Sequence, residues 1–448
     1  ILANASDEGI RLHQDAPGKL LSVIEMNGSD KNNIIQYDIE LTARFFEFAS
    51  IAYQGLSNEK RRQLEWYVPS EKKDFASVLQ MALQSGHSLI EQEPVYPLYK
   101  NLKLQLKYYR DSVLNIEWEP IGLLQLPLKL GDSSEIIPKI KQRLHLFKDL
   151  ANYSDGVKFD SSLFHGVKRF QLRHGLAPSG IVDKEFVSTI NVKPQERIRQ
   201  MLINMERCRW LPSEPDSAFI MINIPAYKLL FFNKGKIIWK DNVVVGKEGW
   251  QTTIFSGKIQ EVVFNPYWVV PNTILAEELF QKIRNDKNYL SQNHFEVVSL
   301  RHPKKIVDAE KIDWLKIDPA HFPYELRQKP GPWNALGRFK FVFPNSYQIY
   351  LHDTPSRNLF SRTQRDFSHG CIRLEHAEEL ARRLLRSLPE PKFEQLINTG
   401  NNKVVKLKQP LPVFILYLTS WVDSQGVLNF RKDIYGHDQR LESTLFSN

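Results

Sequence analysis

The residues best suited to chemistry lie in one short segment that holds Tyr350, His352, His369 and Cys371. Cys371 is one of only two cysteines in the chain, and it follows Ser-His-Gly and precedes Ile-Arg. A thiol becomes a good nucleophile when a nearby imidazole removes its proton. A glycine beside the thiol lets an acyl group approach backbone N–H donors. The pattern therefore predicts a cysteine acyl-transfer site with His352 or His369 as the base.

The same residue types also suit packing and metal binding. A single cysteine is most often a small buried hydrophobic residue, as we predict for Cys208 in its helix-like stretch. Zinc binding is the competing chemistry, because His352, His369, Cys371 and His376 are all possible ligands. The segment has neither a Cys-x-x-Cys pair nor a helical His-x-x-x-His pair. The spacing therefore favours a nucleophile, and we expect no metal.

Length and composition limit the class of protein. A chain of 448 residues with 42% hydrophobic and 25% charged residues is ordinary for a globular protein of two or three domains. No apolar run reaches the ~18 residues that span a bilayer, and the longest, at 411–422, is predicted to be a buried strand. Because the chain begins at Ile1 rather than Met, we expect a longer precursor whose export signal has been removed.

The charge balance points to an anionic partner. The formal net charge is +9, and the basic residues are spread along the chain. No nucleic-acid-binding motif is present, so we expect no nucleic-acid partner. An acidic polymer with many carboxylates fits the charge equally well.

The spacing of apolar residues separates helical from strand-forming regions around the reactive segment. Helical spacing dominates the first half, and strand-like runs begin near Phe219. A charged, helix-prone insertion precedes the reactive segment, and we expect it to form a lid. The predicted parts are an N-terminal arm (1–32), a helical scaffold (33–117), a three-helix unit (134–192), a helical linker completing the scaffold (193–215), a mostly-β domain (216–435) with its lid (272–329), and a C-terminal tail (436–448).

The three-helix unit carries a recognisable motif. Its parts are Val-Lys-Arg-Phe-Gln at 167–171, His-Gly-Leu at 174–176 and Ser-Gly-Ile-Val-Asp at 179–183, with Asp183 placed to cap a helix. This motif resembles a peptidoglycan-binding domain of the three-helix type. The resemblance implies glycan or stem peptides as partners, without identifying the residues of a binding groove.

The β-rich region resembles the catalytic domain of L,D-transpeptidases, in particular the large, periplasmic, Gram-negative type. The resemblance extends to the N-terminal scaffold and so covers nearly the whole chain. It implies an α+β multidomain fold in which a mostly-β catalytic domain carries an inserted lid. The matching stretches, in family order, are 223–227, 244–247, 265–268, 328–332, 334–337, 341–345, 350–354 and 368–371.

The resemblance implies a reaction and roles for the site residues. Cys371 would attack the third residue of a peptidoglycan tetrapeptide stem, release D-alanine and pass the acyl group to an amine of another stem, giving a 3→3 cross-link. His352 would be the general base, oriented by the backbone carbonyl of Asp353, and the N–H groups of Gly370 and Cys371 would bind the oxyanion. No cofactor is required.

Substrate contacts are expected at Tyr350, Ser368, His369, Arg373, Trp268 and Asn334. Ser368 and His369 would also shape the loop, and Arg373 would meet a substrate carboxylate or brace the loop. Small members of the family have Asn where this chain has Arg373, whereas the large type has Arg.

The same resemblance implies a periplasmic enzyme at the periphery of the cell wall that carbapenem-type inhibitors acylate. Two further functions remain open from the sequence. One is an L,D-carboxypeptidase-like hydrolase, which would transfer the acyl group to water. The second is a non-catalytic wall-binding protein that uses only its helical part.

Overall fold

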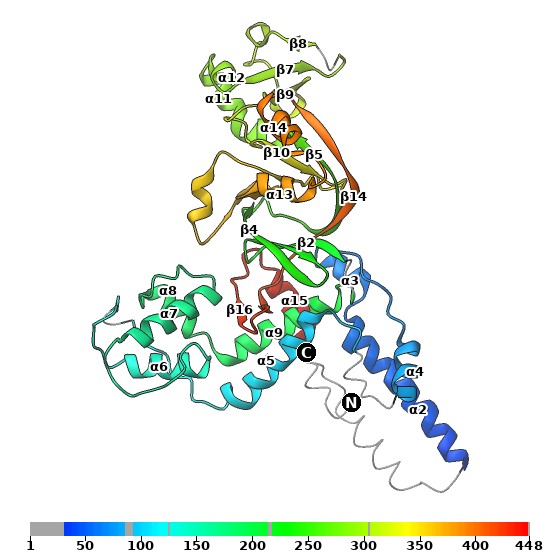
Figure 1. The fold of residues 1–448 in the computed structure, drawn as a ribbon, viewed down its shortest axis with the longest axis vertical. Coiled ribbons are helices and arrows are strands. Elements are labelled where there is room, and N and C mark those ends of the chain that lie inside the picture. The colour runs from blue at the N-terminus through cyan, green and yellow to red at the C-terminus, as the bar shows by residue number, and fades with distance from the viewer. Residues whose placement is uncertain (1–30, 86–92, 124–125, 214–216, 303–304, 447–448) are drawn as a thin grey trace. The chain divides into compact units, whose positions relative to one another are not determined.

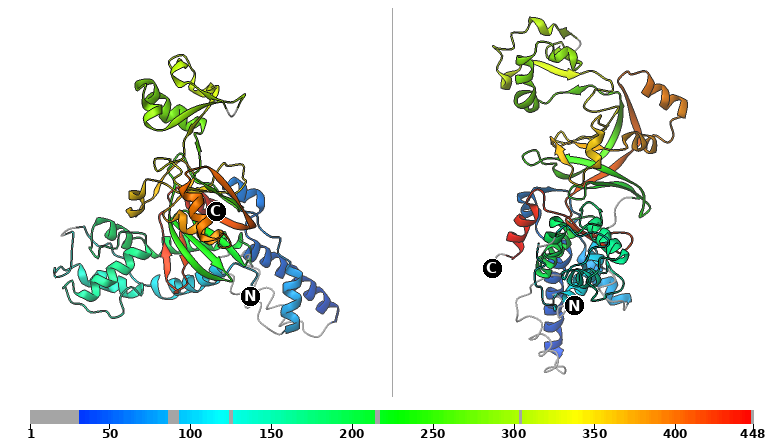
Figure 2. Two further views of the ribbon diagram at one scale, coloured as in Figure 1. Left: turned by 45° about the horizontal axis from the view of Figure 1, so that its top comes forward. Right: turned by 90° about the vertical axis from the view of Figure 1, so that its left-hand side faces the viewer.

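A computed structural model describes residues 31–85, 93–123, 126–213, 217–302 and 305–446 (Figures 1 and 2). The chain divides into two compact units, which we call the helical unit and the β unit. The helical unit combines Ile1–Pro215 with Leu416–Asn448, and the β unit is Asp216–Ile415. The predicted arm at 1–32 lies outside the described residues except for its last two, which begin a helix.

The helical unit is built on apolar faces that repeat at helical spacing. In α9 (Pro194–Arg209), Met201, Met205 and Cys208 lie on one buried face and join the core. Cys208 is buried as predicted, and burial raises the pKa of its thiol to about 12. The other elements of the scaffold are α2 (Lys31–Ala49), η2 (Ser50–Gln54), α3 (Asn58–Gln63), β1 (Trp66–Tyr67), α4 (Phe75–Ser85), α5 (Pro97–Tyr108) and η3 (Tyr109–Val113).

The predicted three-helix arrangement is confirmed. Its helices are α6 (Ile137–Leu146), α7 (Ser161–Arg173) and α8 (Lys184–Ile190). Asp183 caps α8, since its carboxylate accepts a hydrogen bond from the N–H of Phe186 at 2.8 Å. Fully buried apolar side chains from the three helices, among them Ile140, Phe170 and Val187, form a core of their own.

The β unit is built on a closed β-sheet. Its strands follow the order β5-β10-β11-β13-β4-β3-β2-β14, and β14 also pairs with β5, which closes the circuit. The strands are β2 (Ala218–Asn223), β3 (Lys228–Asn233), β4 (Lys236–Gly246), β5 (Ile254–Phe264), β10 (Phe339–Val342), β11 (Leu351–His352), β13 (Ile372–Leu374) and β14 (Lys403–Leu416). Strand β12 (Asp366–Ser368) pairs with β4 outside this circuit, and η7 (Arg357–Ser361), α13 (Ala377–Leu384) and α14 (Glu390–Asn398) complete the unit.

The predicted insertion before the reactive segment is a small subdomain with its own sheet and core. The sheet has the order β6-β9-β7-β8, and Leu275, Phe280 and Leu326 are among its most deeply buried side chains. Its elements are β6 (Trp268–Val269), α10 (Asn272–Ile274), η4 (Leu275–Leu279), α11 (Phe280–Asn285), α12 (Tyr289–Gln292), β7 (Phe295–Ser299), β8 (Ile306–Val307), η5 (Ala309–Lys311), η6 (Pro319–His321) and β9 (Tyr324–Gln328).

The predicted end of the β domain at 435 is wrong. The β unit ends at Ile415, and Leu416–Asn448 returns to the helical unit, where Val422, Leu428 and Phe430 are buried in its core. The segment predicted as a free tail at 436–448 contains α15 (His437–Phe446), and a short hairpin of β15 (Ser420–Val422) and β16 (Leu428–Phe430) precedes it. The apolar run at 411–422 is therefore not one strand, because it breaks after Leu416.

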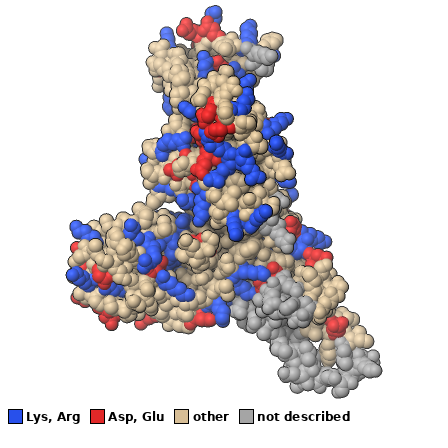
Figure 3. All heavy atoms as spheres, in the orientation of Figure 1, with Lys and Arg blue, Asp and Glu red and all other residues tan. Residues whose placement is uncertain are grey.

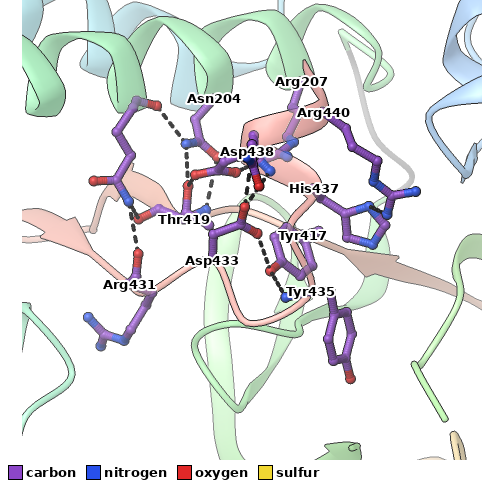
Figure 4. A network of polar contacts seen from close by, with 12 residues as sticks. Asn204, Arg207, Tyr417, Thr419, Arg431, Asp433, Tyr435, His437, Asp438 and Arg440 are labelled. Carbon is purple, nitrogen blue, oxygen red and sulfur yellow. Dashed lines mark hydrogen bonds and ion pairs between the residues drawn. The ribbon is translucent and has the colours of Figure 1, made fainter. Parts of the chain in front are cut away.

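A buried polar network fixes this returning segment to α9 (Figure 4). Asn204 donates to the hydroxyl of Thr419 at 2.8 Å and accepts from its N–H at 2.9 Å. Thr419 in turn donates to Asp438 at 2.6 Å, and Asp438 pairs with Arg207 at 2.5 Å. Such networks require matched partners, so the C-terminal segment is an integral part of the helical unit. Among the described residues, no helix is long and apolar enough to cross a membrane.

Candidate active site

Two short parallel strands bring the reactive segment together. In the pairing of β11 with β13, Leu351 lies opposite Ile372 and His352 lies opposite Arg373. The N–H of Ile372 donates to the carbonyl of Tyr350 at 3.1 Å. This register places Cys371 and Tyr350 at the same ends of neighbouring strands, although 21 positions separate them in the sequence.

His352 is buried and held in one orientation. Its Nδ1 lies 2.5 Å from the backbone oxygen of Asp353, which is the contact expected from the sequence. A carbonyl can only accept, so Nδ1 carries the proton and Nε2 is left as an acceptor. Burial, followed by the charge of Arg373, lowers the pKa of His352 to about 3. The imidazole is therefore neutral near pH 7, with no proton on Nε2.

The thiol of Cys371 is enclosed by the ends of these strands. It lies 3.7 Å from the carbonyl oxygen of Gln348 and is hydrogen bonded to Tyr350. Burial raises the pKa of the thiol, and the hydrogen bonds from Tyr350 oppose that effect. Within the described residues His352 is not a direct hydrogen-bond partner of the thiol, which is common for catalytic pairs without substrate.

Two cations act on the thiol. Lys340 Nζ lies 3.9 Å from the centre of the Tyr350 ring, and both Lys340 and Arg373 favour the thiolate electrostatically. Burial lowers the pKa of Arg373, whose Nε has no hydrogen-bond partner among the described residues. Sequence reasoning missed Lys340, because only the pairing of β10 with β11 brings it to the site.

The loop before Cys371 is held by its own side chains. Ser368 Oγ donates to the carbonyl of Cys371 at 2.5 Å and accepts from the N–H of Gly370 at 3.2 Å. Thr252, which the sequence did not single out, donates to the carbonyl of Gly370 at 2.8 Å. Gly370 has φ +102°, a conformation that strains other residues. The predicted oxyanion donor at Gly370 is thus occupied by Ser368 in this structure.

The insertion contacts this loop directly. Nε2 of His369 lies 2.6 Å from the carboxylate of Glu278 in η4, and the Trp250 ring packs edge-on to the imidazole with centroids 4.9 Å apart. Lys247 is 3.8 Å from the same carboxylate. Glu278 was not predicted, because nothing local in the sequence marks which insertion residue reaches the loop.

The side chain of Asp353 has a separate, structural role. Its carboxylate accepts from the N–H of Arg338 at 2.8 Å and pairs with Arg357 at 2.5 Å. Gly337 makes room for it, since a Cβ there would lie 2.3 Å from the carboxylate oxygen. The carboxylate therefore anchors the backbone whose carbonyl orients His352.

Two predicted substrate contacts are not supported. Asn334 is fully buried, and its amide donates to the carbonyls of Pro266 (3.0 Å) and Lys329 (2.9 Å), so it braces the chain instead. Trp268 packs against Phe295 in the core of the insertion, with ring centroids 6.1 Å apart. Aromatic and amide residues in a motif can serve either substrate binding or packing, and the sequence does not distinguish these two roles.

The four residues considered as zinc ligands have different partners. His352 bonds to Asp353, His369 to Glu278, and Nδ1 of His376 to Asp241 at 2.8 Å. Asp241, Glu375 and His376 form a group that could hold a metal ion, but it contains neither Cys371 nor His352.

Comparisons with known families agree with this geometry. Residues 217–409 match the L,D-transpeptidase catalytic domain of the YkuD family, residues 1–106 match a scaffold domain, and residues 133–190 match a family described as "Putative peptidoglycan binding domain". The β unit of this chain is therefore an L,D-transpeptidase catalytic domain, joined to a scaffold and a peptidoglycan-binding domain.

A curated protein of Haemophilus influenzae, named "Putative L,D-transpeptidase", is 35% identical over 245 residues. The match covers 54% of this chain and 49% of the relative, so the chain spans about half the length of that relative.

Two solved structures are similar to parts of this chain. An L,D-transpeptidase from Stackebrandtia nassauensis is 14% identical, with 64% of this chain and 94% of that chain covered and a TM-score of 0.24. One from Mycobacterium smegmatis is 12% identical, with 45% and 58% covered and a TM-score of 0.23. Similarities this low carry no conclusion about function.

Proposed function

We propose that this protein is a cysteine L,D-transpeptidase that forms 3→3 cross-links in peptidoglycan. The observation that carries the proposal is the thiol of Cys371, enclosed between strand ends with a neutral, oriented His352 and the cations Lys340 and Arg373 nearby. A partly buried thiol with a neighbouring base and positive charges is suited to nucleophilic attack on a carbonyl.

In the first step, the Cys371 sulfur attacks the carbonyl carbon of the third stem residue. A C–S bond forms, the thiol proton passes to His352, and the developing oxyanion is stabilised by the N–H of Cys371 and the surrounding positive charge. The C–N bond to the terminal D-alanine then breaks, and the leaving amine takes the proton from His352. The products are a thioester on Cys371 and free D-alanine.

In the second step, the side-chain amine of an acceptor stem attacks the thioester. An amide forms, the C–S bond breaks, and the proton lost by the amine returns to the sulfur through His352. The net reaction exchanges one amide for another, so it needs neither oxidant nor energy source. Tyr350, His369 and Arg373 are the proposed substrate-facing side chains.

The binding partners follow from the same chemistry. Stem peptides and glycan are the proposed ligands, and the positive net charge favours an anionic polymer. On the face drawn in Figure 3, basic side chains are distributed over the surface rather than gathered in one patch, which suits a diffuse anionic partner. Carbapenem-type β-lactams offer a strained amide carbonyl to the same thiol, and the proposed location is the periplasm, peripheral to the cell wall.

A product assay tests the reaction. Purified disaccharide-tetrapeptide is incubated with the wild-type enzyme or with Cys371→Ala, and the products are separated by chromatography and identified by mass spectrometry. We expect cross-linked dimer and free D-alanine from the wild type and neither from the variant. Tripeptide without dimer would instead identify an L,D-carboxypeptidase-like hydrolase, and no product with retained wall binding would identify a non-catalytic binding protein.

A further inference from the structure

An open cleft of about 610 Å³ lies within the helical unit, and no residue of the β unit lines it. Its walls come from the end of α8, the first half of α9 and the segment from Phe430 to Glu442. Only four of its lining residues fall within the 133–190 match to the peptidoglycan-binding family: His174, Leu176, Ser188 and Thr189. The cleft therefore lies mostly outside that domain, between α9 and the returning C-terminal segment.

The most distinctive group on the cleft is Arg197. Its guanidinium donates to Gln200 Oε1 at 2.9 Å and to the carbonyl of Thr189 at 3.3 Å, and it lies 4.6 Å from the centre of the Phe430 ring. Within the described residues, no carboxylate lies at ion-pair distance from it. Burial lowers the pKa of Arg197 to about 10, which leaves it protonated at neutral pH.

The other charged groups of the cleft have partners within the protein. Arg431 donates to the backbone carbonyls of Arg173 and Phe430, Glu196 accepts from the N–H of Lys193, and Asp433 accepts from the hydroxyl of Tyr417. Arg199 pairs with Glu442 at 3.2 Å, Lys432 with Glu185 at 2.8 Å, and Asp438 with Arg207. A cation enclosed by protein without a counter-ion costs free energy unless an anion joins it. Arg197, whose hydrogen bonds go to a neutral side chain and a carbonyl, thus offers its charge to an outside ligand.

The floor of the cleft is apolar and rigid. Phe430 is buried, and His174 stacks between Phe170 and Phe430 with ring centroids 3.9 and 5.5 Å away. Burial holds the pKa of His174 well below its usual value, so it adds no charge. Leu176 and Ile203 complete this surface. One cation beside an apolar floor fits a carboxylate that carries small alkyl groups.

We infer that this cleft is a second peptidoglycan site, in which Arg197 binds a free carboxylate of a stem peptide while the alkyl groups of the peptide lie along the apolar lining of the cleft. The identity of the ligand rests on the proposed function, whereas the anion site itself does not. Such a site would hold the wall polymer on the helical unit independently of the thiol.

Co-sedimentation of the full chain with purified peptidoglycan sacculi tests the inference, in the Cys371→Ala background so that no acyl-enzyme forms. We expect Arg197→Gln to weaken binding at least fivefold and Arg197→Lys to stay within twofold. Lys184→Gln, which removes one exposed charge outside the cleft, is the matched control and should bind like the parent. Val192→Glu, which places a carboxylate on the cleft to pair with Arg197, should weaken binding as Arg197→Gln does.

A second arm tests the carboxylate. In this arm the carboxylates of the sacculi are amidated. The affinity of the parent for amidated sacculi should fall to the affinity of Arg197→Gln for native sacculi. Unchanged binding of Arg197→Gln and Val192→Glu, or full binding of the parent to amidated sacculi, would overturn the inference. Acylation of wild-type Cys371 is measured separately by mass, so its failure would count against the proposed function and not against the cleft.

Discussion

His352 and Arg373 are register partners on two parallel strands, so a guanidinium stands beside the imidazole proposed as the base. The pairing has opposite effects on the two reacting groups. The charge of Arg373 disfavours a protonated His352 and favours a thiolate at Cys371. One side chain thus keeps the base neutral and partly offsets the burial of the nucleophile.

Replacing Arg373 should therefore weaken the nucleophile. In Arg373→Ala the thiol pKa should rise by about 1 pH unit, because a cation close to the thiolate is lost. Arg373→Lys, which keeps the charge, should stay near the wild-type value. The pH dependence of Cys371 alkylation by iodoacetamide measures this pKa. An unchanged profile in Arg373→Ala would show that the guanidinium does not act on the thiol.

The contact between Glu278 and His369 should position the loop that carries the nucleophile. Because the carboxylate holds the imidazole two residues before Cys371, Glu278→Gln should slow acylation of Cys371 by about tenfold, less than the ~10²-fold that a 1 Å misplacement of a reacting group can cost. Glu277→Gln, an exposed neighbour in the same turn, is the control and should keep the wild-type rate. Equal rates for the two variants would remove Glu278 from the mechanism.

The ion pair of Arg207 with Asp438 should support the helical unit. Arg207→Ala leaves the mostly buried carboxylate of Asp438 without its partner and should lower the free energy of unfolding by about 3–5 kcal/mol. Arg199→Gln breaks the more exposed pair with Glu442 and should cost less than about 1 kcal/mol. Urea denaturation followed by the fluorescence of the helical unit measures both. Similar costs would argue against a structural role for the C-terminal segment.

Acid should destabilise the protein through its buried histidines. Burial lowers the pKa of His437, like that of His352, to about 3 in the folded chain. The unfolded chain binds a proton at each below about pH 6.5, while the folded chain does not, so stability is lost as pH falls. Each of the two histidines should lower the free energy of unfolding by about 2 kcal/mol as the pH falls from 6.5 to 5. His437→Phe should flatten the pH dependence of melting of the helical unit, and an unaltered slope would contradict the assignment.

The sequence was informative where chemistry depends on local spacing. Cys371 in its glycine-bearing loop follows from a short motif, and the contact of His352 with the carbonyl of Asp353 was implied by the family resemblance. Lys340 and Glu278 could not be found in this way, because strand pairing and the fold of the insertion bring them to the site. The burial of Asn334 could not be predicted, because a motif does not show whether an amide bonds to backbone carbonyls or faces a substrate.

The division of the chain into units was harder to predict for a related reason. The segment after Leu416 has the apolar character of a strand, and nothing in its residues indicates which core receives it. Its partners, such as Asn204 and Arg207, lie more than 200 positions earlier, so only the tertiary structure identifies them.

The most direct test of the central claim is the mass of the intact protein after brief exposure to a stem tetrapeptide. We predict that the wild type gains the mass of the tripeptide acyl group on Cys371, with one equivalent of D-alanine released. His352→Ala should gain it at least a hundredfold more slowly, because the loss of a general base costs about 10²–10⁴ in rate. Cys371→Ala should gain nothing. A wild-type protein whose mass does not change, or whose adduct maps to another residue, would contradict Cys371 as the nucleophile.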